Sequence, residues 1–278
     1  MFAQVIFVVW RESVEALLVV GILHAWLAHN AADRGAMKFL WGGVAAGLLT
    51  AVALSVALVG FAEVLPPGWQ DFFQAGLILA ACGLIVQMVF WMRRHGRTLK
   101  RELEEGLSRS VQNGQWWGVF VLALAAIARE GSETVVFLYG ILAAGAAGHL
   151  LQTTLAILLA LAAAFATYWL LQVFARRTSW RLFFRVTEIM LLCLGPALLV
   201  TAVGYLVSFG LLPYTNPVWN TDFLLRDTSS FGGLVASLTG YRSEPDVVTI
   251  ATWIVYWGGI IAAFRLESSF AAARSAKA

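Results

Sequence analysis

The sequence predicts an all-α membrane protein with seven transmembrane helices, built as an inverted repeat of three plus three helices and one C-terminal helix. Three observations predict this class. Hydrophobic residues make up 60% of the 278 residues and charged residues only 13%, which is too apolar for a soluble domain. Seven long apolar stretches follow one another. A charged motif interrupts two of them, at Arg11 to Glu15 and at Arg129 to Glu133.

Each apolar stretch is long enough to cross the hydrocarbon core, which requires about 20 helical residues. Tryptophan and tyrosine gather at several of the ends, Trp91 among them, as in an interfacial aromatic belt. The first stretch lacks a basic leader and a small-residue cleavage site, so we expect it to be retained as a span. The expected spans are residues 2–28, 39–62, 72–92, 115–144, 149–175, 182–211 and 247–265.

Two connections between the spans carry recognisable patterns. In the third connection, residues 93–114, an apolar residue recurs every four positions among charged neighbours: Leu99, Leu103, Leu107 and Val111. This spacing favours an amphipathic helix on the membrane surface, with a solvated helical linker as the alternative. The sixth connection, residues 212–246, is the longest predicted loop outside the membrane. Its acids could attract cations, although solvated loop acids are common: Asp222, Asp227, Glu244 and Asp246.

The distribution of basic residues predicts the orientation. Fifteen of the 19 lysines and arginines fall in the first, third and fifth connections and in the C-terminal tail. The second, fourth and sixth connections contain only Arg226 and Arg242. Basic residues are concentrated on the cytoplasmic side of membrane proteins. We therefore expect the N-terminus outside and the C-terminus in the cytoplasm.

The two motifs indicate an internal repeat of opposite direction. Three spans separate the start of the first span from the start of the fourth, and an odd number reverses the direction of the chain. The sequence Gly-Ile-Leu follows both motifs at a similar distance. We expect one repeat at about 1–92, the connection at about 93–114 and the second repeat at about 115–211. Such repeats place substrate sites near the membrane midplane, at the interface between the repeats.

The doubled motif predicts a cation site. A charge at the bilayer centre costs roughly 2.5–3.5 kcal/mol, so buried charges persist when they are paired or hold an ion. In each motif the two glutamates share one helix face, with the arginine one turn from the second glutamate. Four carboxylates against two guanidinium groups leave a formal charge of −2, which suits a hard, highly charged cation. The expected metal ligands are Glu12, Glu15, Glu130 and Glu133, supported by Arg11 and Arg129.

Other interpretations of the polar residues stay as alternatives. The motifs could form only ion pairs that lock two helices together, although such pairs would explain one acid per helix and not two. A di-iron enzyme would use a Glu-x-x-His pattern, which neither motif has. Glu188 is a weaker metal candidate, because a local ion pair with Arg181 or Arg185 explains it better than a ligand role does. The two cysteines, Cys82 and Cys193, lie in apolar stretches as packing residues do.

Two Arg-Glu-x-x-Glu motifs in the first and fourth of seven spans resemble the oxidase-dependent iron permeases of fungi and bacteria, within the iron/lead transporter superfamily. The resemblance to the bacterial EfeU-type ferrous iron permeases covers nearly the whole chain. It includes Met-Val-Phe-Trp-Met-Arg at 88–93 and the pairs Phe231-Gly232 and Gly240-Tyr241. The family's Arg-Glu-Gly-Leu-Glu reads Arg-Glu-Ser-Val-Glu in the first motif and Arg-Glu-Gly-Ser-Glu in the second, with every charged position intact.

The resemblance implies a permease, not an enzyme, for high-affinity iron uptake across the bacterial cytoplasmic membrane. It implies iron as the transported substrate, no permanently bound cofactor, and the four motif glutamates as iron ligands. It also implies periplasmic partners that oxidise or bind iron, such as a peroxidase or a cupredoxin, and no nucleic acid. A permease for lead or manganese, and a structural membrane subunit, stay as alternatives.

Overall fold

The computed structural model describes residues 2–30, 34–95, 98–112, 116–143, 150–173 and 180–275. Within these ranges the chain forms helices and loops and contains no β-strand, only an isolated bridge between Pro217 and Asp246. The helices are α1 (Phe2–Asn30), α2 (Arg34–Val64), α3 (Pro67–His95), α4 (Leu99–Gln112), α5 (Trp116–Ala143), α6 (Leu150–Val173), α7 (Trp180–Ser208), α8 (Ser230–Thr239) and α9 (Val247–Ser275).

The long helices coincide with the apolar stretches of the sequence. Five of them are long and apolar enough to cross a membrane, namely α2, α3, α6, α7 and α9. The helices α1 and α5 have similar lengths, but each carries the three charged residues of a motif. The chain is therefore an all-helical, multi-pass membrane protein, and the motif charges set α1 and α5 apart from the other long helices.

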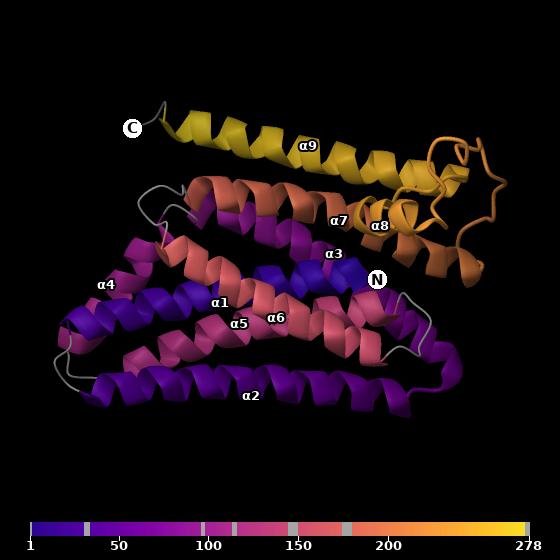
Figure 1. Ribbon diagram of the computed structural model, residues 1–278. Helices are drawn as coiled ribbons and strands as arrows, with labels where there is room; N and C mark the ends of the chain where they lie inside the picture. The colour runs from indigo at the N-terminus through magenta and orange to yellow at the C-terminus, as the bar shows by residue number, and fades with distance from the viewer. Residues whose placement is uncertain are drawn as a thin grey trace.

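The long helices lie alongside one another, with α1 in the interior and α2 and α9 at opposite edges (Figure 1). The N-terminus of α1 lies at the end of the bundle that carries α8 (Figure 1). The helix α4 and the C-terminus lie at the opposite end (Figure 1). The bundle thus has two distinct ends, each covered by one short helix.

The most extensive helix contact joins α2 to α5. Glycine permits this close approach, because a Cβ on Gly43 would lie 2.4 Å from the carbonyl oxygen of Phe120. Gly131, inside the second motif, likewise lies against Ala51, whose Cβ would be 2.7 Å from an added Cβ. Small residues at helix interfaces are the usual means of close packing in membranes. The second motif is therefore held directly against α2.

The next most extensive contact joins α1 to α6. The indole Nε1 of Trp10 donates a hydrogen bond of 3.0 Å to Oγ1 of Thr167. Val14 and Leu18 of α1 are buried against Ala164 of α6. The two motif helices thus have equivalent partners, since α2 packs on α5 and α6 packs on α1.

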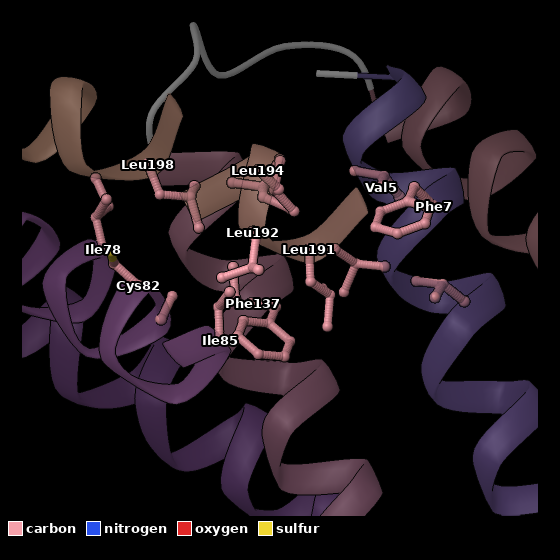
Figure 2. Packing of buried hydrophobic residues seen from close by; sticks show 14 of the residues in the cluster. Val5, Phe7, Ile78, Cys82, Ile85, Phe137, Leu191, Leu192, Leu194 and Leu198 are labelled. Carbon is pink, nitrogen blue, oxygen red and sulfur yellow. The ribbon is translucent and has the colours of Figure 1, made fainter. Parts of the chain in front are cut away.

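Two hydrophobic cores flank the motifs along α1 and α5. The large core combines residues of α1, α3, α5, α6, α7 and α9, and Figure 2 shows Phe137 together with Ile85 and Leu191 near its centre. The small core contains Leu23 and Leu27 of α1, with residues of α2, α4 and α5. On both motif helices the charged residues therefore lie between two blocks of packed apolar side chains.

The third connection contains the amphipathic helix α4, whose apolar face packs inside the protein. Leu107 is completely buried in the small core and Leu103 is half-buried beside it. The opposite face is charged, with Arg101 3.5 Å from Glu105. Its apolar face contacts α1 and α5. The side chain of Val111, the last member of the predicted spacing, lies outside the described residues.

The sixth connection contains a helix that the sequence analysis did not predict. The helix α8 begins at the cap residue Ser229, whose Oγ accepts a hydrogen bond of 3.0 Å from the backbone nitrogen of Gly232. It ends at Gly240, which has a left-handed φ of 71° and packs against Ala197 of α7. Both are standard cap residues. Gly240 is required twice, for its positive φ and for the close approach to α7.

Candidate metal centre

The motif residues meet where α1 and α5 contact each other. The helical spacing turns both glutamates of each motif towards the partner helix. All four glutamates and one arginine are buried in the protein: Arg11, Glu12, Glu15, Glu130 and Glu133. The two motifs are more than 100 residues apart in the sequence, and the fold brings their charged side chains together. Burial of any one of these charges alone would cost free energy.

Three of the four predicted ligands form a compact group. Carboxylate oxygens of Glu12, Glu130 and Glu133 all lie within 4.8 Å of one another. Among the residues that the structure describes, Oε2 of each of these glutamates is buried without a hydrogen-bond partner. Buried polar atoms normally have partners, and unpaired ones cost free energy. These oxygens, drawn from both helices, can converge on a cation.

The fourth predicted ligand, Glu15, is engaged by Arg11. The guanidinium of Arg11 lies 2.6 Å from Oε1 of Glu12 through Nη1 and 2.6 Å from Oε1 of Glu15 through Nη2. The Arg11 side chain is 0% exposed, so both ion pairs are inside the protein. Buried pairs of this kind interact strongly because little water screens them. Arg11 therefore offsets one of the two negative charges of its own motif.

Arg11 also contacts two methionines of α3, which the sequence analysis did not assign to the site. Nη1 donates to Sδ of Met88 at 3.0 Å and Nη2 donates to Sδ of Met92 at 2.9 Å. The sequence analysis had noted these residues only within the stretch that resembles the iron permeases. Their spacing of four residues places them on one face of a helix. This spacing was the only sign in the sequence that the two methionines could act together.

Arg129 is placed differently in the second motif. Its side chain is 31% exposed, and Nε donates a hydrogen bond of 3.0 Å to Oε1 of Glu133. Its guanidinium carbon lies 3.9 Å from the ring centroid of Trp91 on α3, which is a cation–π geometry. Trp91, which the sequence analysis placed in an interfacial belt, thus also contacts the motif. Its position near the end of α3 brings its ring to the motif.

The hydroxyl residues near the second motif bond to their own helix. Oγ of Ser132 donates to the carbonyl oxygen of Arg129 at 2.8 Å, and Oγ1 of Thr134 donates to that of Glu130 at 2.7 Å. Such bonds to preceding backbone carbonyls are common for serine and threonine in helices. These donors are thus directed along α5 and leave the unpaired oxygens of Glu130 and Glu133 to other partners.

The weaker candidate Glu188 forms an ion pair. Oε1 of Glu188 on α7 lies 2.5 Å from Nε of Arg93 on α3, and Arg93 also stacks on Phe264 of α9. Glu188 thus forms an ion pair, but its partner is Arg93 of another helix and not the neighbouring Arg185 that the sequence analysis proposed. The side chain of Arg181 lies outside the described residues. Glu188 joins helices and is not part of the three-glutamate group.

The acids of the sixth connection bond within that connection and to the start of α9. Oδ1 of Asp246 accepts a hydrogen bond of 3.0 Å from the backbone nitrogen of Thr249, and Oδ2 accepts one of 3.1 Å from Thr215. Partial burial opposes ionisation of Asp246, but these hydrogen bonds outweigh it and lower the pKa of its carboxyl. Asp227 and Glu244 also accept hydrogen bonds from loop side chains. Asp227, Glu244 and Asp246 therefore help to hold the loop in shape.

Comparison with known proteins identifies the family. The model of the iron permease FTR1 family matches residues 1–276. The chain belongs to this family. It is 28% identical over 271 residues to the ferrous iron permease EfeU of Shigella sonnei (strain Ss046), covering 96% of this chain and 97% of that relative. It is also 28% identical over 262 residues to the EfeU of Escherichia coli O6:H1 (strain CFT073), covering 93% of this chain and 94% of that relative.

A more distant relative extends the same match. The ferrous iron permease EfeU of Yersinia pestis is 24% identical over 254 residues, covering 90% of this chain and 88% of the relative. No solved structure matches the chain. The family assignment confirms the resemblance drawn from the motifs, and it makes this chain a transporter of the membrane and not an enzyme.

Proposed function

We propose that this permease takes up iron across the bacterial cytoplasmic membrane through a midplane site built from the glutamates of both motifs. The observation that carries the proposal is the group of Glu12, Glu130 and Glu133, whose carboxylate oxygens lie within 4.8 Å of one another. Their buried Oε2 atoms lack hydrogen-bond partners among the described residues. A metal ion would supply the missing interaction for all three at once. Glu15 completes the ligand set once Arg11 releases it.

The charge of the site supports an ion of two or three positive charges. Four glutamates with Arg11 and Arg129 carry a formal charge of −2, so Fe²⁺ would bring the site to neutrality and Fe³⁺ to +1. The relatives are named ferrous iron permeases, which favours Fe²⁺ as the imported ion. Periplasmic proteins that oxidise or deliver iron would serve the outer side, as the family resemblance implies.

The reciprocal packing of the helices supports the inverted repeat. In repeat 1 (about 1–92) and repeat 2 (about 115–211), the second helix of each repeat packs on the first helix of the other, α2 on α5 and α6 on α1. A two-fold axis in the membrane plane relates such pairs. The arrangement proposed is therefore seven spans, with α9 appended, the N-terminus outside and the C-terminus in the cytoplasm.

The two hydrophobic cores suggest how iron would move. The large core closes the site towards the N-terminal end of α1, and the small core closes it towards α4. In the proposed orientation these are the outer and the cytoplasmic sides. Iron would enter when the large core parts, bind the glutamates, and leave when the small core parts. Protonation of a ligand glutamate would weaken its hold on the ion and aid release.

Uptake of radiolabelled iron into proteoliposomes tests the proposal. We expect Glu130→Gln and Glu133→Gln each to abolish uptake, because each removes one charged ligand with little change in volume. Glu188→Gln is the matched control, since it removes an ion pair outside the three-glutamate group, and we expect it to retain uptake. Wild-type rates in correctly inserted Glu130→Gln protein would contradict the proposal.

Competition in the same vesicles addresses the other cations. Excess Pb²⁺ or Mn²⁺ should reduce iron uptake less than an equal excess of unlabelled iron. The other alternative is a structural subunit in which the motifs only lock helices. The ion pairs of Arg11 would fit that role, but they leave Oε2 of Glu130 without a partner in the described chain. Metal binding that is independent of all four glutamates would favour the structural subunit.

A further inference from the structure

The guanidinium of Arg11 is surrounded by two carboxylate oxygens and two thioether sulfurs. Nη1 contacts Oε1 of Glu12 at 2.6 Å and Sδ of Met88 at 3.0 Å. Nη2 contacts Oε1 of Glu15 at 2.6 Å and Sδ of Met92 at 2.9 Å. Each nitrogen thus has one carboxylate and one thioether neighbour. The two methionines lie one helical turn apart on α3 and are both buried.

The thioethers are poor partners for a buried guanidinium. Methionine sulfur accepts hydrogen bonds only weakly, whereas a carbonyl, amide or carboxylate oxygen accepts them well. The chain has only five methionines, and two of them contact this one guanidinium. Their presence therefore calls for a reason other than holding Arg11, and soft donor atoms beside carboxylates are typical of metal sites.

We propose that Met88 and Met92, with Glu12 and Glu15, form a mixed oxygen–sulfur subsite that a borderline divalent metal ion enters when the Arg11 side chain moves out. An ion at the position of Nη1 would lie 2.6 Å from a carboxylate oxygen and 3.0 Å from a thioether sulfur. Zinc bonds of about 2.1 Å to carboxylate oxygen and about 2.3 Å to thiolate sulfur set the scale, so the donor atoms would have to move by at least roughly half an ångström. Methionine, with its flexible unbranched side chain, can make such a shift.

The charges of the exchange balance. Glu12 and Glu15 carry two negative charges, which Arg11 offsets only in part, so a divalent ion in its place makes the subsite neutral. Arg11 loses two carboxylate contacts and two weak thioether contacts when it leaves. Because Glu12 also belongs to the three-glutamate group, the subsite and that group share a ligand. An ion could pass from one to the other without losing all of its ligands.

The subsite would determine which metal the permease accepts. Oxygen-only sites favour hard ions such as Mg²⁺, Mn²⁺ or Fe³⁺, whereas thioethers favour softer ones. A path that includes Met88 and Met92 would therefore prefer Fe²⁺ to Fe³⁺ and to Mn²⁺. This inference rests on the proposed function, since it assigns specificity to the same site.

X-ray absorption at the iron edge tests the subsite directly. The purified full-length permease is loaded with Fe²⁺ without oxygen, and sulfur is expected among the nearest neighbours of the metal. The double variant Met88→Leu, Met92→Leu should lose this sulfur signal, and leucine preserves the volume of the side chains. Met190→Leu, on an exposed face of α7, and Cys82→Ala should both retain it. A shell of oxygen and nitrogen alone in the wild-type protein would overturn the subsite.

Metal competition gives a second, independent measurement. The ratio of Cd²⁺ to Mn²⁺ affinity should fall roughly tenfold or more in the double methionine variant, because both soft donors are lost. An unchanged ratio would count against the subsite. The uptake assay of Glu130→Gln separately tests the proposed function. If uptake requires Glu130 but no sulfur is found at the iron, the subsite fails and the proposed function stands.

Discussion

The two motifs have the same charged residues and different surroundings. In the first motif Arg11 is completely buried and contacts both glutamates of its own helix. In the second motif Arg129 is 31% exposed and bonds only Glu133 among the glutamates. The three-glutamate group accordingly takes one glutamate from α1 and both from α5. Equivalent sequence positions in a repeat therefore need not contribute equally to one site.

The helix α3 accounts for much of this difference. It supplies two thioethers to Arg11 and an aromatic ring to Arg129. A single helix thus contacts the arginines of both motifs. The four predictions that follow compare the motifs directly, from the largest expected effect to the smallest.

The largest difference is expected between Glu130→Gln and Glu15→Gln in metal affinity. Glu130 belongs to the three-glutamate group, whereas Glu15 lies outside it and has Oε1 2.6 Å from Nη2 of Arg11. Loss of a residue that only supports a metal ligand lowers metal affinity about 10–100-fold. We therefore expect metal affinity to fall more than roughly 100-fold in Glu130→Gln, which loses a ligand, and roughly tenfold in Glu15→Gln. Equilibrium binding of Fe²⁺ to the purified variants measures both. Equal losses would show that the motifs contribute equally.

The next effect concerns stability when each arginine is removed. Arg11→Gln leaves two buried carboxylates without their cation, and breaking a buried ion pair in this way costs about 3–5 kcal/mol. Arg129→Gln removes a partly exposed pair and should cost only about 1 kcal/mol. Denaturation in detergent measures both free energies of unfolding.

Added metal should restore the stability of Arg11→Gln more than that of Arg129→Gln. A divalent cation can replace the charge of Arg11 beside Glu12 and Glu15, so it should restore much of the stability of Arg11→Gln. The conservative Arg11→Lys variant is the control, because it keeps the charge but loses the two-nitrogen geometry. Equal destabilisation by Arg11→Gln and Arg129→Gln would contradict the expectation that the buried Arg11 stabilises the protein more than Arg129.

A smaller contrast is expected at the third position of each motif. Gly131→Ala places a Cβ 2.7 Å from that of Ala51, and overpacking of this kind costs about 1–3 kcal/mol. Ser13→Ala removes only a hydroxyl from a half-buried position and should change stability by about 0.5 kcal/mol or less. Gly83→Ala, on the open face of α3, controls for helix propensity. Unfolding of the three variants in one detergent provides the comparison, and a neutral Gly131→Ala would contradict the close contact.

The smallest effect is expected at the ring beneath Arg129. Trp91→Leu removes the cation–π contact of 3.9 Å, which contributes about 1 kcal/mol at a partly exposed site. We expect a modest rise in the iron concentration for half-maximal uptake, because Arg129 then holds Glu133 less firmly. Trp253→Leu, on α9 away from the motif, is the control. An unchanged uptake curve for Trp91→Leu would indicate that the ring does not position Arg129.

Much of the fold could be predicted from the sequence, because a helix that crosses the membrane requires a long run of hydrophobic residues. The seven apolar stretches correspond to long helices, and the four-residue spacing of Leu103 and Leu107 corresponds to α4. The clustering of Glu12, Glu130 and Glu133 followed from the repeat. The helix α8 was missed, because ten residues bounded by Ser229 and Gly240 give a weak signal beside spans of 24 or more.

The surroundings of the arginines could not be predicted, because they depend on how α3 crosses the motif helices. Periodicity shows that Met88 and Met92 share a face, but not that this face meets α1. The unequal burial of Arg11 and Arg129 likewise arises from packing between distant segments. Intra-helix spacing therefore predicts which charges occur together, and tertiary packing decides which of them are left for a metal.

The packed cores on either side of the motifs also bear on the bioenergetics of the cell. A membrane protein with a continuous water-filled path through its centre would let protons and sodium leak and would discharge the membrane potential. Here clusters of buried apolar side chains lie on either side of the carboxylates along α1 and α5, and close-packed interiors leave little room for a chain of water molecules. Ion flow is then limited by the microsecond-to-millisecond motions of helices. A permease packed in this way can therefore lie in the membrane without dissipating the gradients on which the cell depends.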